Sequence, residues 1–327
     1  MSRVLVTGAT GFAGSQLTKR LLTDGFDVRV LVRPQTNPSF LSLLGAEIAS
    51  GDVTDMDSVK RAVEEIDTVY HVAALFREAK FPDDTYWAVN YEGAMNVLRA
   101  AHDAGVQRFV HCSTVGVLGN IENPPATEEA PYNPGDVYQR SKCRAEQDVL
   151  KFHKETGFPV SIVRPAAIYG PGDRRWLKLF RSVGRQKFMM IGTGETLIHF
   201  IYISDLVEMF RLASDSPKAV GQVYIAADDR YVSLNELVAT IASVVNVQTP
   251  KTHIPVAPVR LASGLVEDVC RALHVEPPIF RRRVDFFVKN RAFDITKAKT
   301  ELGFKPSVSM QEGIRRTTDW YQEHNLL

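Results

Sequence analysis

Two patterns of hydrophobic and polar residues alternate through the first half of the chain. Short runs rich in β-branched residues are separated by longer stretches in which apolar residues recur every three or four positions. This alternation predicts repeated βαβ units and a parallel sheet with helices on both faces. The predicted strands cover 3–7, 28–32, 47–50, 68–73, 109–113 and 160–164. The predicted helices cover 13–24, 56–65, 84–104 and 137–156.

The pattern loses this regularity after residue 164, where proline and glycine residues indicate turns and loops. The further strands that we predict are 200–203 and 223–226. The further helices are 206–214, 234–245, 259–273 and 310–324. We therefore predict an α/β fold, a doubly wound parallel sheet with a smaller C-terminal lobe that is interwoven with it in sequence. The sheet domain would span 1–165, with 198–230 returning to it, and the lobe would span 166–197 and 231–327.

Composition narrows the class of protein. The 327 residues are 45% hydrophobic and 24% charged, which is typical of a soluble globular protein. A net charge of +1 favours small-molecule or protein partners over nucleic acid or a membrane. The cysteines at 112, 143 and 270 follow neither disulfide nor metal-site spacing, so we expect no metal and a cytoplasmic location. Charged residues interrupt the apolar stretch 255–275, which we interpret as an ordinary helix.

Three glycines mark the first turn of the chain. Gly8, Gly11 and Gly14 follow an apolar strand and open an amphipathic helix. Such a turn lets the backbone approach a pyrophosphate, and the helix N-terminus offers unpaired N–H groups. A tight strand-to-helix crossover would also need small residues here. The position of the motif favours a dinucleotide, so 1–165 is predicted to bind a nicotinamide cofactor and the later lobe its substrate.

Selectivity for the cofactor is expected at the ends of the second and third strands. Arg33 stands where a carboxylate would bind the ribose of NAD, and an arginine can neutralise the 2′-phosphate of NADP. NADP(H) is therefore favoured and NAD(H) stays possible, since a solvated surface arginine is the alternative. Asp52 is placed to meet the adenine end, although an aspartate after a strand is also a common helix cap.

A tyrosine and a lysine four residues apart provide the candidate chemistry. Tyr138 and Lys142 share one face of a predicted helix. A phenol has an ordinary pKa near 10, and a neighbouring ammonium lowers that pKa by stabilising the phenolate. Tyr138 could then exchange a proton with an alcohol or ketone as hydride moves.

Several motifs together resemble one superfamily over nearly the whole chain. They are Thr7-Gly-Ala-Thr-Gly-Phe-Ala-Gly14, Gly51-Asp52, His71-Val-Ala-Ala74, Asn90-Tyr-Glu-Gly93, Tyr138-Gln-Arg-Ser-Lys142, Arg164-Pro-Ala-Ala-Ile-Tyr-Gly-Pro171 and Leu302-Gly-Phe-Lys-Pro306. With them the chain resembles the extended branch of the short-chain dehydrogenase/reductase superfamily, the NAD-dependent epimerase/dehydratase group. The resemblance implies a Rossmann fold and a homodimer formed through the helices 84–104 and 137–156.

The resemblance also implies roles for individual residues. The catalytic set is Tyr138, Lys142 and Thr114, with Ser113 as the second choice for the hydroxyl on the reacting oxygen. Cofactor contacts are expected from Gly8, Thr10, Gly11, Phe12, Ala13, Gly14, Arg33, Asp52, Val53, Ala73, Ala74, Asn90, Lys142, Pro165 and Ile168. The neighbouring His71, Cys112 and Cys143 have no assigned role and are interpreted as structural.

Two substrate classes fit the resemblance. The first is a nucleotide sugar, handled by an epimerase or ketoreductase, with Arg174, Arg175 and Arg283 available for its diphosphate. The second is a ketone or secondary alcohol, as in the dihydroflavonol reductase and 3β-hydroxysteroid dehydrogenase branches. Ile198-His199-Phe200 lacks an arginine expected in sugar epimerases, but the nucleotide sugar is our leading hypothesis. A third class, a non-catalytic regulator that senses NADP(H), is disfavoured because Tyr138 and Lys142 are both present.

Overall fold

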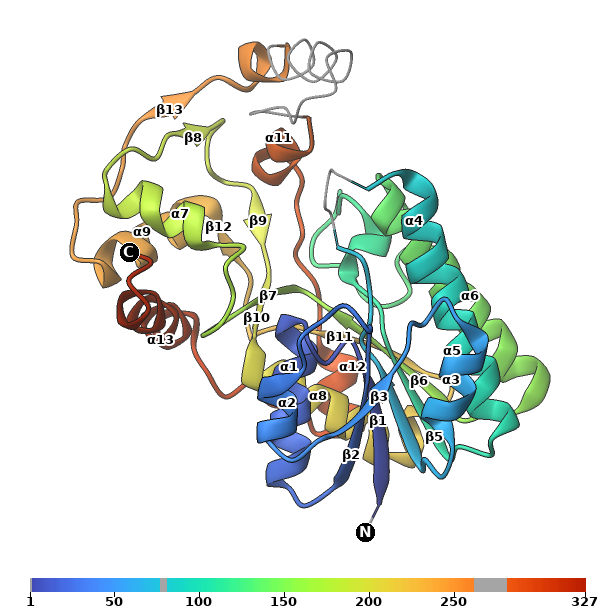
Figure 1. Cartoon of the computed structure of the whole chain (residues 1–327). Helices are drawn as coiled ribbons and strands as arrows, with labels where there is room; N and C mark the ends of the chain where they lie inside the picture. The colour runs from blue at the N-terminus through green and yellow to red at the C-terminus, as the bar shows by residue number, and fades with distance from the viewer. Residues whose placement is uncertain (1, 77–80, 262–280) are drawn as a thin grey trace.

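The centre of the protein is a sheet of seven parallel strands (Figure 1). The computed structural model describes residues 2–76, 81–261 and 281–327, with the side chains at 281–283 excepted. In spatial order the strands are β3 (Glu47–Ser50), β2 (Asp27–Val32), β1 (Arg3–Thr7), β4 (Thr68–His71), β5 (Arg108–Cys112), β6 (Val160–Pro165) and β11 (Val223–Ala226). The strand order reverses between β1 and β4, and ligands bind at such a switch point in open α/β sheets. The predicted doubly wound α/β fold is confirmed.

Helices cover both faces of this sheet. On one face lie α1 (Phe12–Thr23) and α8 (Ile203–Asp215), and on the other α3 (Met56–Val63), α5 (Gly93–Asp103) and α6 (Val137–Thr156). Side chains of successive strand residues point to opposite faces. Val4 and Val6 therefore pack in the cluster that contains Leu17 of α1, and Leu5 packs in the cluster that contains Val59 of α3.

The predicted elements of the first half are confirmed, apart from small shifts at their ends. The strand predicted for 68–73 ends at His71 because the N–H of Ala73 donates to the side chain of Thr7 instead of continuing the ladder. The helix predicted for 84–104 forms α4 (Asp83–Trp87), a π-helical turn at Ala88–Glu92, and α5. The prediction omitted the short helix α2 (Ser39–Leu43).

The second half contains more regular structure than the sequence indicated. The helices α7 (Leu177–Gly184), α11 (Arg281–Val288) and α12 (Thr296–Leu302) were not predicted. Neither were the short strands β7 (Ala167–Tyr169), β8 (Met190–Ile191), β9 (Leu197–Ile198), β12 (Val232–Ser233) and β13 (His253–Ile254). The strands are only two or three residues long, so they show no hydrophobic period of their own. The helices have seven or eight residues, too few for a long periodic pattern.

In the described part of the C-terminal lobe, helices pack around an apolar core. α7, α9 (Leu234–Val244) and α13 (Met310–Glu323) contribute buried residues to it, Phe286 and Phe287 of α11 pack against it, and β10 (Phe200–Tyr202) pairs with β7. The predicted helix 259–273 lies outside the described residues from 262 onward. The division into two domains stays a prediction, and α12, which falls in the predicted lobe segment, contacts β11 of the sheet.

Candidate active site

The glycine turn lies between β1 and α1, at the carboxyl edge of the sheet. Gly8 has φ +76°, and a Cβ there would lie 2.7 Å from the backbone of Ala73. A Cβ on Gly14 would overlap the carbonyl oxygen of Gly8. Gly11 begins α1 without a side-chain cap, so N–H groups of the first helical turn are open to an anion. This cradle fits the pyrophosphate of a dinucleotide.

The carboxyl ends of β1 and β4 are joined by a short polar network. Thr7 Oγ1 lies 2.9 Å from Nδ1 of His71 and accepts from the N–H of Ala73 at 3.2 Å. Burial, together with the nearby charge of Lys142, lowers the pKa of His71 to about 3, so the imidazole is neutral. The network places Ala73 beside Gly8.

Asn90 braces the loop that follows β4. It is buried, and its amide accepts from the N–H of Leu75 at 2.7 Å and donates to Ser141 Oγ of α6 at 3.0 Å. Ser141 lies between Tyr138 and Lys142 in the sequence. The structure therefore places this predicted cofactor residue in the interior, where it joins the loop after β4 to α6.

Lys142 projects from α6 toward β5. It is 1% exposed, and Nζ donates to the carbonyl oxygen of Cys112 at 2.6 Å. Burial lowers the pKa of its ammonium group. The helix begins at Asp136, whose carboxylate accepts from the N–H of Gln139, so the first turn that holds Tyr138 is fixed.

Apolar and aromatic side chains surround Tyr138. Its ring is 6% exposed and meets the ring of Phe76 edge-on, with centroids 5.0 Å apart. The other members of this cluster are Leu75, Phe81, Tyr86, Trp87 and Val137. A substrate that reaches the Tyr138 phenol therefore passes a wall made largely of hydrocarbon.

The structure separates the two hydroxyl candidates after β5. Ser113 Oγ donates to the buried carboxylate of Glu146 at 2.5 Å, so it is committed to the interior. Thr114 is partly exposed and accepts from the N–H of Gly116 at 3.0 Å, and within the described residues its own proton has no acceptor. Thr114 is the better placed of the two to meet a reacting oxygen.

A buried ion pair that the sequence did not indicate supports this edge. Arg164 and Glu146 are 2% and 0% exposed, and their side chains approach to 2.5 Å. Tyr132 donates to the same carboxylate at 2.7 Å. In the sequence, Glu146 lies one helical turn after Lys142, which indicates that it shares a face of the helix with Lys142. That spacing does not identify Arg164 as its partner.

The cofactor-selectivity residues lie side by side at the ends of β2 and β3. Arg33 is exposed, and its guanidinium has no partner within the described residues. Asp52 Oδ1 accepts from the N–H and the hydroxyl of Thr54, both at 2.9 Å, whereas the cap of α3 is Asp55. Val53 is buried against Gly93. At the start of α1, Thr10 is exposed and Ala13 partly so, and Ala74 is exposed after β4.

Arg175 closes the opposite side of the cleft. It forms two hydrogen bonds with the buried Asp173, at 2.8 and 2.9 Å, and a third with the carbonyl of Ile168. Its guanidinium carbon lies 5.5 Å from the ring centroid of Phe12 and 5.6 Å from that of Phe76. Arg175 thus spans the gap between the glycine-turn helix and the wall beside Tyr138.

The remaining substrate candidates differ in their surroundings. Arg174 is exposed and unpaired within the described ranges, and the side chain of Arg283 lies outside them. His199 is buried and bonded to the carbonyl of Asp228, and burial lowers its pKa to about 4. Pro165, at the end of β6, is buried.

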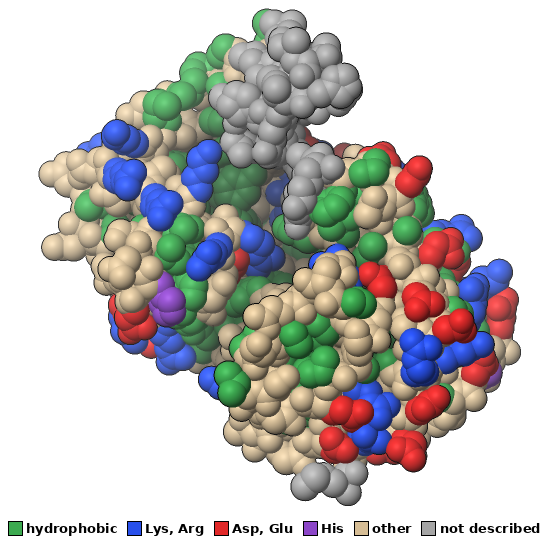
Figure 2. Space-filling view, in the orientation of Figure 1, with side chains coloured by type: hydrophobic (Ala, Val, Ile, Leu, Met, Phe, Trp, Pro, Cys, Tyr) green, Lys and Arg blue, Asp and Glu red, His purple; other side chains and the backbone are tan. Residues whose placement is uncertain are grey.

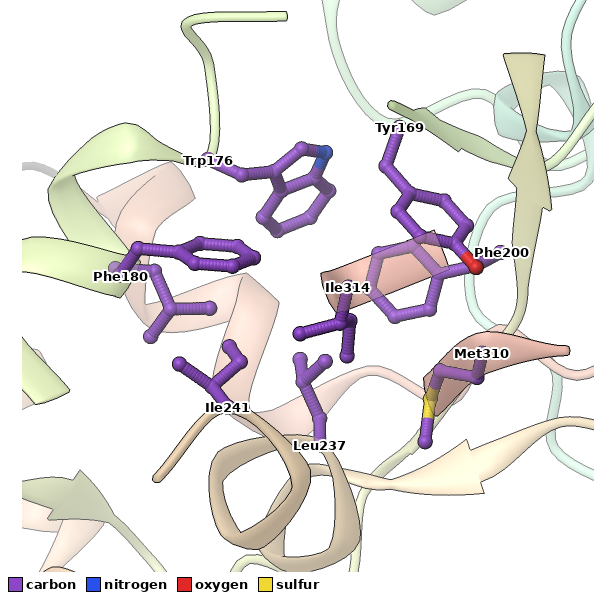
Figure 3. A pocket seen from close by; sticks show the side chains of 9 residues that line it. Tyr169, Trp176, Phe180, Phe200, Leu237, Ile241, Met310 and Ile314 are labelled. Atoms are coloured by element: carbon purple, nitrogen blue, oxygen red, sulfur yellow. The ribbon is translucent and has the colours of Figure 1, made fainter. Parts of the chain in front are cut away.

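The surface between the sheet domain and the lobe is hollowed and contains hydrophobic side chains, with lysines and arginines on the lobe side (Figure 2). Trp176 donates to the carbonyl of Ile168 at this boundary. Its ring also lines a small apolar pocket inside the lobe with Tyr169, Phe200 and Met310 (Figure 3). The interior of the lobe is therefore apolar, whereas its surface beside the cleft carries basic side chains as well as hydrophobic ones.

Sequence comparison identifies the family. A model of the NAD dependent epimerase/dehydratase family matches residues 4–227. The chain belongs to this family. It is an NAD(P)-dependent enzyme of the short-chain dehydrogenase/reductase type, as the motifs indicated. Among the described residues no helix is long and apolar enough to cross a membrane, and no group of three or more His, Cys, Asp or Glu could hold a metal ion.

Relatives with different reactions match nearly the full chain. The N-acetyl-α-D-glucosaminyl-diphospho-ditrans,octacis-undecaprenol 4-epimerase of Escherichia coli O157:H7 is 29% identical, covering 98% of this chain and 96% of the relative. The 4-hydroxy-2-methyl-3-oxo-4-farnesyl-3,4-dihydroquinoline-1-oxide ketoreductase of Stigmatella aurantiaca is 30% identical, covering 95% and 94%. The 3β-hydroxysteroid dehydrogenase/Δ5→4-isomerase of Mycobacterium tuberculosis is 31% identical, covering 98% and 90%. The crystal structure of gox2253 is 29% identical and superposes with a TM-score of 0.85, covering 100% of each chain.

Proposed function

We propose that this enzyme transfers hydride at a secondary alcohol or ketone carbon of a molecule with a large apolar part. The observation that carries the proposal is the apolar wall around Tyr138, formed by Phe76 and its neighbours. The names of the epimerase, the ketoreductase and the steroid dehydrogenase contain undecaprenol, farnesyl and steroid groups, which are all largely hydrocarbon. Burying such surface contributes about 25 cal/mol per Å² to binding.

A nucleotide sugar, our leading hypothesis from the sequence, is now the second candidate. Arg175 is neutralised by Asp173, and His199 is buried and bonded to backbone. In the described part of this loop, Arg174 is exposed and has no acidic partner. An unpaired arginine can bind a diphosphate, so Arg174 is the reason to retain the nucleotide-sugar candidate.

Proton transfer falls to Tyr138 in this proposal. When bound, the nicotinamide supplies or accepts the hydride. For reduction of a ketone, the Tyr138 hydroxyl gives its proton to the carbonyl oxygen as the carbon receives hydride, and the product is the alcohol. Thr114 donates a hydrogen bond to the same oxygen. The buried ammonium of Lys142 stabilises the phenolate that remains.

A substrate panel tests the apolar class. We expect 3-ketosteroids or long-chain ketones to give a higher kcat/KM than UDP-sugars. Phe76→Ser should lower kcat/KM for the apolar substrates by about tenfold, because the exposed ring that would cover the substrate's hydrocarbon part beside Tyr138 is lost. Phe40→Ser, at another exposed aromatic residue, is the matched control. Faster turnover of UDP-sugars, unchanged in Phe76→Ser, would overturn this assignment.

We infer that the preferred cofactor is NADP(H), on the ground of the unpaired Arg33 at the end of β2. Arg33→Ala should weaken NADP binding by about tenfold and leave NAD binding unchanged. Arg61→Ala, at an exposed arginine of α3, serves as the control. Tighter binding of NAD than NADP by the unaltered protein would refute the inference.

We also propose a homodimer formed by the outer faces of α5 and α6. The proposal rests on the resemblance of these adjacent helices to those that pair across a two-fold axis in the superfamily. Sedimentation at micromolar concentration should give a dimer, and a monomer there would refute it. We also propose a cytoplasmic location, because the cysteines follow neither disulfide nor metal-site spacing.

A further inference from the structure

A second cavity lies between α1, the first turn of α8, and α13 of the C-terminal lobe. Its volume is about 320 Å³, which is within the range of small-molecule sites. Its lining includes neither the glycine turn nor Thr114, Tyr138 or Lys142, so it is separate from the candidate active site.

One wall of this cavity is basic. Lys19 and Arg20 of α1 line it together with Arg316 of α13, and none of its described lining residues is acidic. Arg20 is held by Asp24 at 2.9 Å, and Arg316 by Glu312 at 2.6 Å. Lys19 is exposed, and its ammonium has no ion pair or hydrogen bond to any residue in the described ranges. The wall thus carries one positive charge that the protein does not neutralise.

The beginning of α8 adds donors to this wall. Tyr202 is the N-cap of the helix, no side chain caps the first turn, and Ser204 faces the cavity beside it. The first N–H groups of a helix have no partners within it, and the helix dipole places partial positive charge there. Asp205, in the same turn, is bonded to Ser307 and Val308. An anionic group is therefore the complement of Lys19 and Ser204, and Arg316, although paired with Glu312, adds a further donor to the same wall.

The opposite wall is apolar, with Pro171, Ile203 and Val207. We propose that the cavity binds a small phosphomonoester, with its phosphate at Lys19 and Arg316 and its carbon skeleton against Pro171 and Val207. A phosphate offers three acceptor oxygens to donors that come from several directions. Because α1 begins at the glycine turn and α13 belongs to the lobe, the ligand joins the two halves of the molecule across their boundary.

Calorimetry on the full chain tests the proposal. Glycerol 3-phosphate and inorganic phosphate are titrated at constant ionic strength with the cofactor saturating, so that the pyrophosphate site is filled. We expect Lys19→Gln and Arg316→Gln each to weaken glycerol 3-phosphate binding by about tenfold, since each removes a charged hydrogen bond. Arg315→Gln is the matched control, because Arg315 bonds the same Glu312 but does not line the cavity.

The outcomes separate the alternatives. Tighter binding of glycerol 3-phosphate than of inorganic phosphate, lost in Lys19→Gln and kept in Arg315→Gln, supports the site as described. Equal binding of the two probes would overturn the role of the apolar wall. Absence of binding by the unaltered protein, or an unchanged affinity in both cavity variants, would overturn the site itself.

Discussion

The two walls of the cleft are held in place by different interactions. At the sheet edge, hydrogen bonds fix Thr7, Asn90, Ser113 and Lys142, with partners 2.5 to 3.2 Å away. The lobe is organised by an apolar cluster around Phe180. Hydrogen bonds are directional, whereas burial of apolar surface is not. We propose that the hydrogen-bonded wall at the sheet edge, here called the polar wall, sets the positions of the reacting atoms. The apolar side chains that would meet the substrate come from the neighbours of Tyr138 as well as from the lobe.

The strongest test of the polar wall is Tyr138→Phe. Removal of the hydroxyl should lower kcat by about a thousandfold, since general acid–base catalysis contributes about 10² to 10⁴. The Kd of the cofactor should not change, because Tyr138 lies on α6 and the glycine turn on α1. Steady-state kinetics and a cofactor titration measure the two quantities. Retention of full activity would show that Tyr138 is not the proton donor. The proposal that the polar wall positions the reacting atoms would then be wrong.

Substitution of Glu146 tests the buried ion pair that stabilises the polar wall. Glu146→Ala leaves the guanidinium of Arg164 buried without its carboxylate. Losing one partner of a buried ion pair costs about 3 to 5 kcal/mol of the free energy of unfolding. Urea unfolding should show this loss, and Glu129→Ala, at an exposed glutamate of the same region, should show almost none. Equal effects of both substitutions would mean that the ion pair is not a support.

Buried histidines make the free energy of unfolding depend on pH. Burial lowers the pKa of His71 to about 3 and that of His199 to about 4, and holds the pKa of His111 well below its ordinary value. Unfolded imidazoles bind protons below about pH 6.5 while these stay neutral, so stability falls as the pH falls. Between pH 7 and 5 the loss is about 2 kcal/mol each for His71 and His199.

Burial lowers the pKa of His111 as well, so His111→Gln should reduce the acid-dependent loss of stability. Urea unfolding at pH 7 and pH 5 measures the difference. His324→Gln, at an exposed histidine, should leave the loss unchanged. A loss of stability that is the same in His111→Gln as in the unaltered protein would contradict the assignment.

The smallest expected effects distinguish the two arginines on the lobe side. Arg175→Ala should lower kcat/KM by about tenfold, because Phe12 and Phe76 lose the cation between them and Asp173 loses its partner. Arg174→Ala should change kcat/KM by less than about twofold with an apolar substrate, as is usual for a solvated charge. A tenfold loss in Arg174→Ala would instead indicate a diphosphate on the substrate.

The sheet domain was predictable because its signals are local and repeated. The buried strands are apolar runs between turn residues, as β1 is, and the long helices show their own period, as α6 does. The glycine turn follows directly from the residues that can form it. The lobe elements α7 and β8 are short, and their partners are distant in sequence, such as β13 for β8. No window of the sequence contains both partners.

The sequence by itself determined the sheet, the glycine cradle and the pairing of Tyr138 with Lys142, because spacing along one strand or helix fixes which residues share a face. Only the tertiary structure committed Ser113 to Glu146, paired Arg175 with Asp173 and bonded Asn90 to the loop after β4. Each of these outcomes depends on a partner group that folding brings into contact: the carboxylate of Glu146, the carboxylate of Asp173 and the backbone N–H of Leu75. Asp173 lies only two residues from Arg175 in the sequence, but folding is what buries its carboxylate. Burial and partner choice arise when segments distant in sequence pack together, so the spacing of residues alone does not determine them.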